Sequence, residues 1–242
     1  MKTSFGLRIV ALAVMVFDGM ALLTACGGAD APAKSNADLL KDAVANMKVA
    51  KTYHIEADIT SSGQHVTLSG DMDVVGKNLK LSMNAAGQAM DVVKVGADTY
   101  SSLDGGKTYT KAGAAAVPDL SSFTSMWDSI KPEDVDKAKD GLKDGTPPTE
   151  KIGDADTKHI TGNGKDLSQL MATSDPNAQD STIDFWITTD AKPTIRQMKF
   201  SGKDAKGSET SGTFKWSNID GPMNITAPPV SLLPPVVAYA MR

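Results

Sequence analysis

Regular alternation of apolar and polar residues is the feature that most limits what this chain can fold into. In TYHIEADIT, residues 52–60, every second position is apolar. These positions are Tyr53, Ile55, Ala57 and Ile59. Side chains of a β-strand point alternately to its two faces, so a period of two predicts a strand with one buried face.

The same alternation recurs in residues 66–74 and 79–83, and glycine-containing pairs separate the stretches. The pairs Gly63-Gln64, Gly76-Lys77 and Gly87-Gln88 are typical of turns. Strands joined by such short turns form an antiparallel meander with one apolar face and one face exposed to water. Residues 90–102 and 107–113 extend this sheet, and further strands are expected at about 149–161, 181–189, 194–203 and 207–218.

The apolar face is the candidate binding surface. If the sheet is curved, it leaves a hydrophobic cavity between itself and the helices, and flexible methionines on the face suit variable acyl chains. The alternative is that the helices cover the face completely and make it an ordinary core. The predicted lining residues are Ile55, Ile59, Val66, Leu68, Met72, Leu79, Leu81, Met83, Met90, Val92, Phe185, Ile187, Met198 and Phe200.

Four segments carry helical rather than strand patterns. Residues 36–50 place Leu39, Leu40, Ala43, Val44 and Met47 at helical spacing, with Ser35 or Asn36 available as the N-cap. The other three helices are expected at residues 120–130, 131–143 and 164–172.

The N-terminal segment has the layout of a secretory signal. Lys2 and Arg8 precede the apolar run 9–17, which is too short to span a bilayer as a helix. The run is followed by Leu23-Thr24-Ala25-Cys26, which holds the only cysteine of the chain and resembles the bacterial lipobox. The resemblance implies cleavage before Cys26 and attachment of diacylglyceryl and palmitate-type acyl chains to it. Two or more such chains hold a protein firmly on a membrane.

These observations divide the chain into four parts. Residues 1–25 are the signal peptide, and 26–35 are the lipidated cysteine with a flexible tether. Residues 36–226 form the folded domain, and 227–242 are a proline-rich tail expected to be extended, edge-bound or disordered.

The sequence argues against nucleic-acid binding and against catalysis. The chain has 25 Lys and Arg against 29 Asp and Glu, with no basic cluster that could contact phosphates. His54, His65 and His159 fall on predicted strands without zinc-site spacing, so they are interpreted as surface residues rather than ligands. No nucleophile elbow or phosphate-binding loop is present. We therefore expect no metal, no cofactor and no enzymatic activity.

Taken together, the lipobox, YHIEADIT, VTLSGDMDVVGKNLKLSM, MWDSIKPEDV and DFWITTDAKPTIRQMKFSG resemble the LppX/LprG-type lipoproteins, relatives of the LolA/LolB carriers. The resemblance implies an α+β fold: an incomplete antiparallel β-barrel with helices on its concave face and a hydrophobic cavity between. It also implies a protein anchored on the extracytoplasmic face of the cell membrane. Such a protein binds acyl chains of a lipid or glycolipid and carries it across or within the envelope, with a transport partner.

Two other functions remain open. A non-enzymatic envelope scaffold or sensor would have the same fold with a filled core and no ligand cavity. An enzyme has support only from scattered Asp, His and Thr residues.

Overall fold

The computed structural model describes residues 34–112, 126–163, 181–203 and 207–230. Residues 126–129 form one further helical turn. The elements are α1 (Asn36–Lys48), β1 (Thr52–Ser61), β2 (Gln64–Asp73), β3 (Asn78–Ala85), β4 (Gln88–Val95), β5 (Asp98–Ser102), β6 (Thr110–Ala112), α3 (Pro132–Ala138), the 3₁₀ turn η2 (Lys139–Gly141), β7 (Lys143–Ile152), β8 (Ala155–Asn163), β9 (Thr182–Thr188), β10 (Ile195–Lys203) and β11 (Glu209–Ser217).

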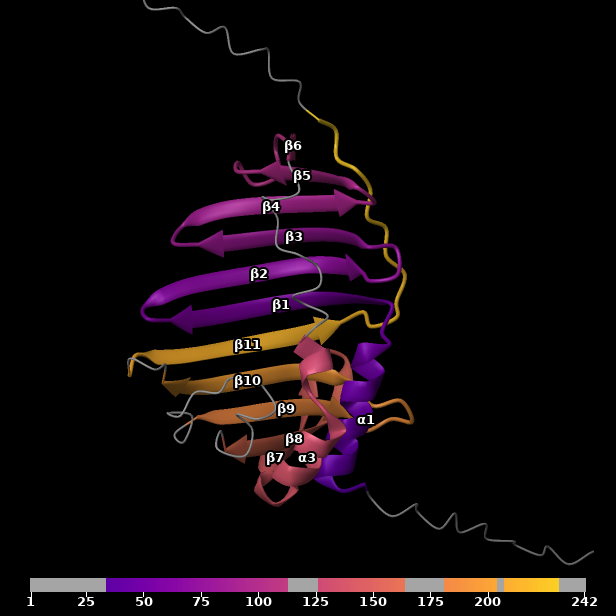
Figure 1. The fold of residues 1–242 in the computed structure, drawn as a ribbon, viewed down its shortest axis with the longest axis vertical. Helices are drawn as coiled ribbons and strands as arrows, with labels where there is room; N and C mark the ends of the chain where they lie inside the picture. Colours follow the sequence, from indigo (N-terminus) through magenta and orange to yellow (C-terminus); the bar gives the residue numbers. More distant parts are fainter. Residues whose placement is uncertain (1–33, 113–125, 164–180, 204–206, 231–242) are drawn as a thin grey trace, which may run out of the picture. The chain divides into compact units, whose positions relative to one another are not determined.

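The strands form one open sheet of eleven strands (Figure 1). Its order is β6-β5-β4-β3-β2-β1-β11-β10-β9-β8-β7, and every neighbouring pair is antiparallel. The strands β1–β6 form one meander and β7–β11 a second, and the pairing of β1 with β11 joins them, so that β6 and β7 lie at opposite edges of the sheet. The open antiparallel sheet of the predicted half-barrel is therefore confirmed.

Two-residue turns fix the register of the N-terminal hairpins. Ser62 and Gly63 connect β1 to β2, and Ala86 and Gly87 connect β3 to β4. All four residues have positive φ, between 50° and 80°. This is the type I′ turn, whose backbone twist matches that of the strands it joins. The predicted turns at Gly63 and Gly87 are each centred on the glycine and the residue before it, whereas Gly76 and Lys77 belong to a four-residue turn, 74–77, in which Lys77 has φ 55°.

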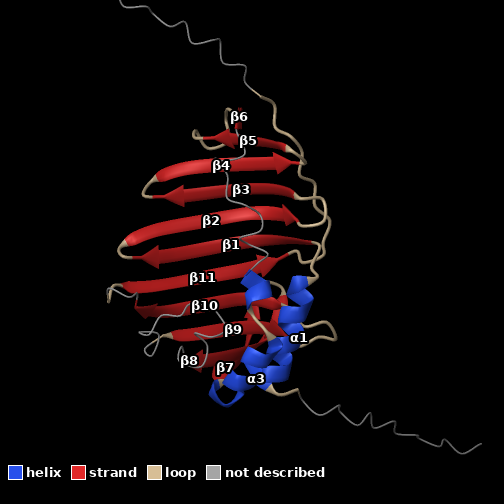
Figure 2. Cartoon of the chain, in the orientation of Figure 1, coloured by secondary structure: helices blue, strands red, loops and turns tan. Residues whose placement is uncertain are grey.

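Helix α1 begins and ends close to the predicted positions. The Ser35 hydroxyl accepts a hydrogen bond from the backbone N–H of Asp38 at 3.1 Å, which makes Ser35 the N-cap. The helix ends at Lys48 rather than 50, because Val49 leaves the helical conformation. The predicted apolar stripe is buried, and α1 contacts β9 and β10. Figure 2 shows the described helices gathered beside the β7–β10 part of the sheet.

Two predicted elements are wrong in their extent. The single strand expected at 149–161 is a hairpin, in which β7 and β8 are joined by a turn at Gly153 with φ 61°. The strand β7 was missed because its Pro147 and Pro148 argue against a strand, yet β7 is an edge strand with a register shift between Asp144 and Thr149, where prolines are tolerated. The helix expected at 131–143 ends at Ala138, and β7 begins at Lys143.

The segment after β11 follows the ends of the strands. In Figure 1 it runs past the ends of β1–β5, and Val230 forms a parallel bridge with Tyr109. Of the proline-rich tail, the structure describes residues 227–230, and this bridge holds Val230 beside Tyr109.

Several predictions lie outside the described residues. These are the signal peptide 1–25, Cys26 with its tether up to residue 33, the 120–125 part of one helix, the helix 164–172 and the tail beyond 230. Within the described residues, no helix is long and apolar enough to cross a membrane.

Candidate functional site

The sheet has one apolar face, and the register shows which side chains share it. Residues directly opposite each other in an antiparallel pair point to the same side. Leu81 lies opposite Val92, Leu68 opposite Met83, and Met198 opposite both Phe214 and Phe185. We call this side the apolar face. The register places all the predicted lining residues on it: Ile55, Ile59, Val66, Leu68, Met72, Leu79, Leu81, Met83, Met90, Val92, Phe185, Ile187, Met198 and Phe200.

Burial divides the apolar face into two ends. We call the fully buried part the buried end; of the predicted residues it holds Ile55, Met72, Leu79, Leu81, Val92, Phe185, Ile187 and Met198, each at most 1% exposed. We call the half-buried part the open end; it holds Ile59, Val66, Leu68, Met83, Met90 and Phe200, together with Phe214.

The open end is continuous across neighbouring strands. Met90 of β4 lies opposite Met83 of β3, which lies opposite Leu68 of β2. On the far side of β1, Phe214 and Phe200 continue the surface on β11 and β10. Phe200 lies opposite Gly212, and a Cβ at that glycine would lie 2.4 Å from the Phe200 ring. The absent side chain therefore lets the ring lie against the sheet backbone.

A row of aromatic rings connects the two ends. Phe200 and Phe214 have ring centroids 6.2 Å apart, and Phe214 and Trp216 are 5.9 Å apart. Trp216 then contacts Trp127 at 4.9 Å. Three residues of this row, Phe214, Trp216 and Trp127, were missed as site residues. In FKWS the alternation places Phe214 and Trp216 on one face, whereas Trp127 comes from the helical segment that follows residue 125.

Except for Val92, the buried end shares one core with the helices. Leu40, Ala43 and Met47 of α1 and Ile130 belong to the same buried cluster as Ile55. Tyr53 lies in this cluster and is 1% exposed. Burial raises the pKa of Tyr53 to about 12, because the interior disfavours the phenolate.

The opposite face of the sheet, here the outer face, is mostly polar, although Val93, Tyr100 and Trp186 on it are buried. His54 Nδ1 lies 2.7 Å from Asp71 Oδ1, and His65 Nε2 lies 2.9 Å from Asp58 Oδ1. His54 is half-buried and His65 is exposed. Among the described residues, no group of three or more His, Cys, Asp or Glu side chains is placed to hold a metal ion.

His159 contradicts its interpretation as a surface residue. It is 7% exposed and stacks on Trp186, with ring centroids 4.2 Å apart. Its Nδ1 lies 3.1 Å from the Pro147 carbonyl oxygen, and its Nε2 lies 2.9 Å from Asp184 Oδ1. The prediction failed because β7 was not recognised, and this edge strand lies over the imidazole.

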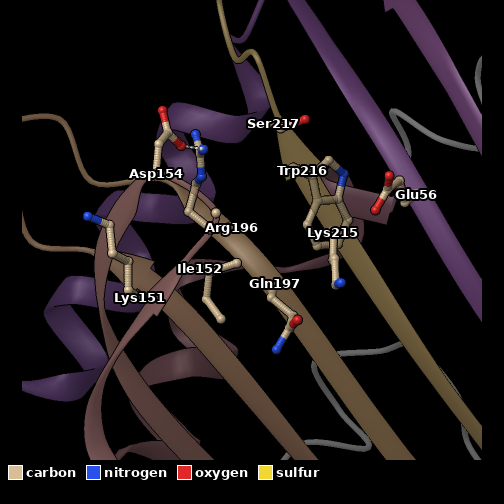
Figure 3. Close-up of a pocket in the computed structure, with 10 residues that line it drawn as sticks. Glu56, Lys151, Ile152, Asp154, Arg196, Gln197, Lys215, Trp216 and Ser217 are labelled. Carbon is tan, nitrogen blue, oxygen red and sulfur yellow. Dashed lines mark hydrogen bonds and ion pairs between the residues drawn. The ribbon is translucent and has the colours of Figure 1, made fainter.

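The outer face also carries a shallow groove of about 380 Å³ (Figure 3). Glu56, Lys151 and Lys215 line it with charges of both signs, and Gln197 adds an amide. Arg196 is paired there with Asp154, with Nη2 and Oδ1 2.6 Å apart. The groove brings together no nucleophile with a base, so it offers polar contacts rather than a catalytic arrangement.

Comparison with known proteins identifies the fold. No protein-family model and no curated protein sequence matches the chain. The solved structure of lipoprotein LppX from Mycobacterium tuberculosis matches 79% of this chain and 98% of its own, at 15% identity and a TM-score of 0.51. LprF from Mycobacterium bovis matches 80% of this chain and 96% of its own, at 15% identity and a TM-score of 0.54. The chain therefore has the LppX/LprG-type lipoprotein fold, as the sequence motifs predicted.

Proposed function

Starting from the fold it shares with LppX and LprF, we propose that this protein is a membrane-anchored envelope lipoprotein that binds acyl chains against its apolar face. It carries a lipid or glycolipid across or within the envelope and performs no catalysis. The half-buried open end is the observation that carries the proposal.

The open end has the extent and chemistry that an alkyl chain requires. It is a continuous apolar surface from β4 to β10, and continuous apolar surface on a folded domain usually marks a binding site. Each methylene removed from water contributes about 0.8 kcal/mol. An acyl chain of about 16 carbons therefore gains roughly 13 kcal/mol from full burial, enough to offset the cost of ordering it.

The two ends of the face have different parts in this function. Leu68, Met83 and Met90 of the open end contact the acyl chains directly, and flexible methionines adapt to chains of different length. Leu81 and Phe185 of the buried end hold the sheet and the helices together, so that the binding surface keeps its form.

Anchoring follows from Cys26. The tether between Cys26 and Asn36, the first residue of α1, lets the domain sit near the membrane surface from which it takes its lipid. A Cys26→Ala variant should lose incorporation of labelled palmitate and move from the membrane fraction to the soluble fraction. Labelling that persists in the variant contradicts the anchor.

The main test is lipid content. Protein purified from its host's envelope without added lipid is analysed by native mass spectrometry and then by solvent extraction. We expect adducts of lipid mass that extraction removes, and a delipidated protein that takes up a fluorescent acyl probe. Protein that carries no lipid and binds no probe would support the scaffold or sensor function, in which the same fold has no ligand cavity.

A further inference from the structure

Three polar hydrogens lie in the apolar core without an acceptor. Tyr53 Oη, Trp127 Nε1 and Trp216 Nε1 are buried, and none of them has a hydrogen-bond partner among the residues that the structure describes. The residues are 1%, 1% and 2% exposed. Buried Tyr and Trp side chains normally have a partner, because a donor removed from water without one costs free energy.

The three donors belong to one place. Trp127 and Trp216 are in ring contact, with centroids 4.9 Å apart. Trp216 lies opposite Ile55 across β11 and β1, and Tyr53 is the next residue along the same face of β1. All three belong to the same buried cluster.

Packing alone does not account for these polar atoms. Phe185 in the same cluster, with Phe200 and Phe214 packed against it, shows that the face accommodates phenylalanine. A phenyl ring at position 53 would fill nearly the same volume without a hydroxyl to desolvate. The remaining buried atom without a partner, Arg196 Nε, belongs to the residue that lines the outer groove, where its Nη2 is paired with Asp154.

The chemistry of the donors selects the group that they would bind. An indole N–H only donates, and a phenol can donate to any acceptor oxygen. Among the described residues that are fully buried on this face, none carries a charge. A carboxylate or phosphate buried there would lack a cation, and burying an unpaired charge is very costly. A neutral carbonyl oxygen has no such cost.

We propose that Tyr53, Trp127 and Trp216 donate hydrogen bonds to the ester oxygens of a neutral, ester-linked lipid whose chains lie along the open end. This inference rests on the proposed function and names its ligand class. The row of aromatic rings indicates how the lipid is oriented. Its chains cover Phe200 and Phe214, and its ester group reaches Trp216 at the boundary of the buried end.

The first test uses the three tryptophans as probes in one spectrum. The ¹⁵N-labelled protein is titrated with dipalmitoylglycerol and, separately, with dihexadecylglycerol, which has the same chains but no ester carbonyl. We expect the indole N–H signals of Trp127 and Trp216 to move downfield with the diester and much less with the diether. Trp186 is the internal control, because its Nε1 already donates to Glu150 Oε2 at 2.7 Å on the outer face.

Each outcome of the titration decides between the two proposals. If both lipids bind and move the Trp127 and Trp216 signals by the same amount, the ester contact is wrong and lipid binding stands. A third titration uses palmitic acid; if it binds and moves these signals more than the diester does, the neutral ligand class is wrong. If no lipid binds, the proposed function fails and this inference fails with it.

The second test is the Tyr53→Phe variant, which removes one oxygen atom. Since that hydroxyl has no partner in the free protein, its loss should leave the melting temperature unchanged or raise it. Affinity for dipalmitoylglycerol should fall about fivefold, the factor expected for one neutral hydrogen bond, while affinity for dihexadecylglycerol should stay the same. Tyr100→Phe is the matched control, because Tyr100 lies opposite Val93 on the outer face. If the affinity for both lipids falls equally, or the affinity for neither falls, the role of Tyr53 is overturned.

Discussion

The buried end and the open end of the apolar face contain the same kinds of residue and differ in what packs on them. Ile55 and Leu81 at the buried end belong to one core with α1 and Trp127, whereas Leu68 and Met83 at the open end are only half-buried. One alternating pattern therefore produces two surfaces with different uses. We attribute the stability of the fold to the buried end and the binding of the acyl chains to the open end, with only the proposed ester contacts reaching the buried end, and the predictions below test that division.

The largest effect is expected from a charge at the buried end. Leu81→Asp removes a side chain that is 1% exposed and buries a carboxylate without a partner. The expected loss exceeds about 5 kcal/mol, which is enough to unfold a typical domain. Lys80→Asp is the control, because Lys80 is exposed on the outer face. Denaturant unfolding monitored by circular dichroism measures both, and equal loss in the two variants would show that the register is wrong.

A matched pair of phenylalanines compares the two ends without a change of charge. Phe185→Ala at the buried end should cost about 3–5 kcal/mol, because it leaves a cavity in a closed core. Phe200→Ala on the neighbouring strand should cost less than half as much, because Phe200 is only partly buried and water can fill the space. Both values come from urea unfolding of the lipid-free protein. Similar costs would mean that the open end is part of the closed core.

Substitution at the open end should affect lipid binding more than it affects stability. Met83→Asp should lower the affinity for a fluorescent acyl probe at least about tenfold, because the carboxylate must lose water when the chain covers it. Its cost in stability should stay near 1 kcal/mol, since the half-buried carboxylate remains hydrated in the free protein. Asn84→Asp adds the same charge one residue along on the outer face, and its affinity should not change. A probe that binds both variants equally would place the lipid elsewhere.

The smallest effect concerns an exposed clamp near the start of β1. Asp220 accepts a hydrogen bond from the Lys51 backbone N–H at 2.8 Å and pairs with Lys192 at 2.6 Å. The hydrogen bond from the Lys192 ammonium, followed by that from Lys51, holds the pKa of Asp220 below its ordinary value of 3.8. The clamp thus stabilises the fold above about pH 4 and is lost as the pH falls through the lowered pKa.

Asp220→Asn should therefore lower stability at pH 7 by less than about 1 kcal/mol, and the difference from wild type should vanish in acid. Acyl-probe affinity at pH 7 should stay unchanged, because Asp220 lies off the open end. Urea unfolding at pH 7 and at pH 2.5 measures the stability difference. A difference that grows toward acid contradicts the assigned direction.

The sequence predicted on which face of the sheet each side chain lies, but not how deeply that side chain is buried. Period two in residues 52–60 and 79–83 was sufficient to place Ile55 and Leu81 on the apolar face, because a strand admits only two orientations. Whether Leu81 or Met83 is the more deeply buried depends on which segments pack on the sheet from distant parts of the chain. Local alternation does not contain that information.

The same limit explains the residues that were missed. His159 alternates like a surface residue, and it is buried by β7, a strand whose two prolines conceal it in the sequence. Trp127 sits on a helical stripe, and its contact with Trp216 spans 89 positions of sequence, a pairing that only the folded structure reveals. By contrast, Phe214 and Trp216 follow the alternation of β11 and were available to sequence reasoning.

Thiol protection by lipid tests the division of the apolar face most directly. Because the chain has a single cysteine, Cys26→Ala gives a background in which Leu68→Cys, Ile55→Cys or Thr67→Cys introduces the only thiol. We predict that the Leu68→Cys thiol reacts with maleimide in the delipidated protein and is protected when lipid is added. The Ile55→Cys thiol should be unreactive in both states, and the Thr67→Cys thiol on the outer face should react equally with and without lipid. Equal reactivity at positions 55 and 68, or no protection of position 68 by bound lipid, would contradict the account.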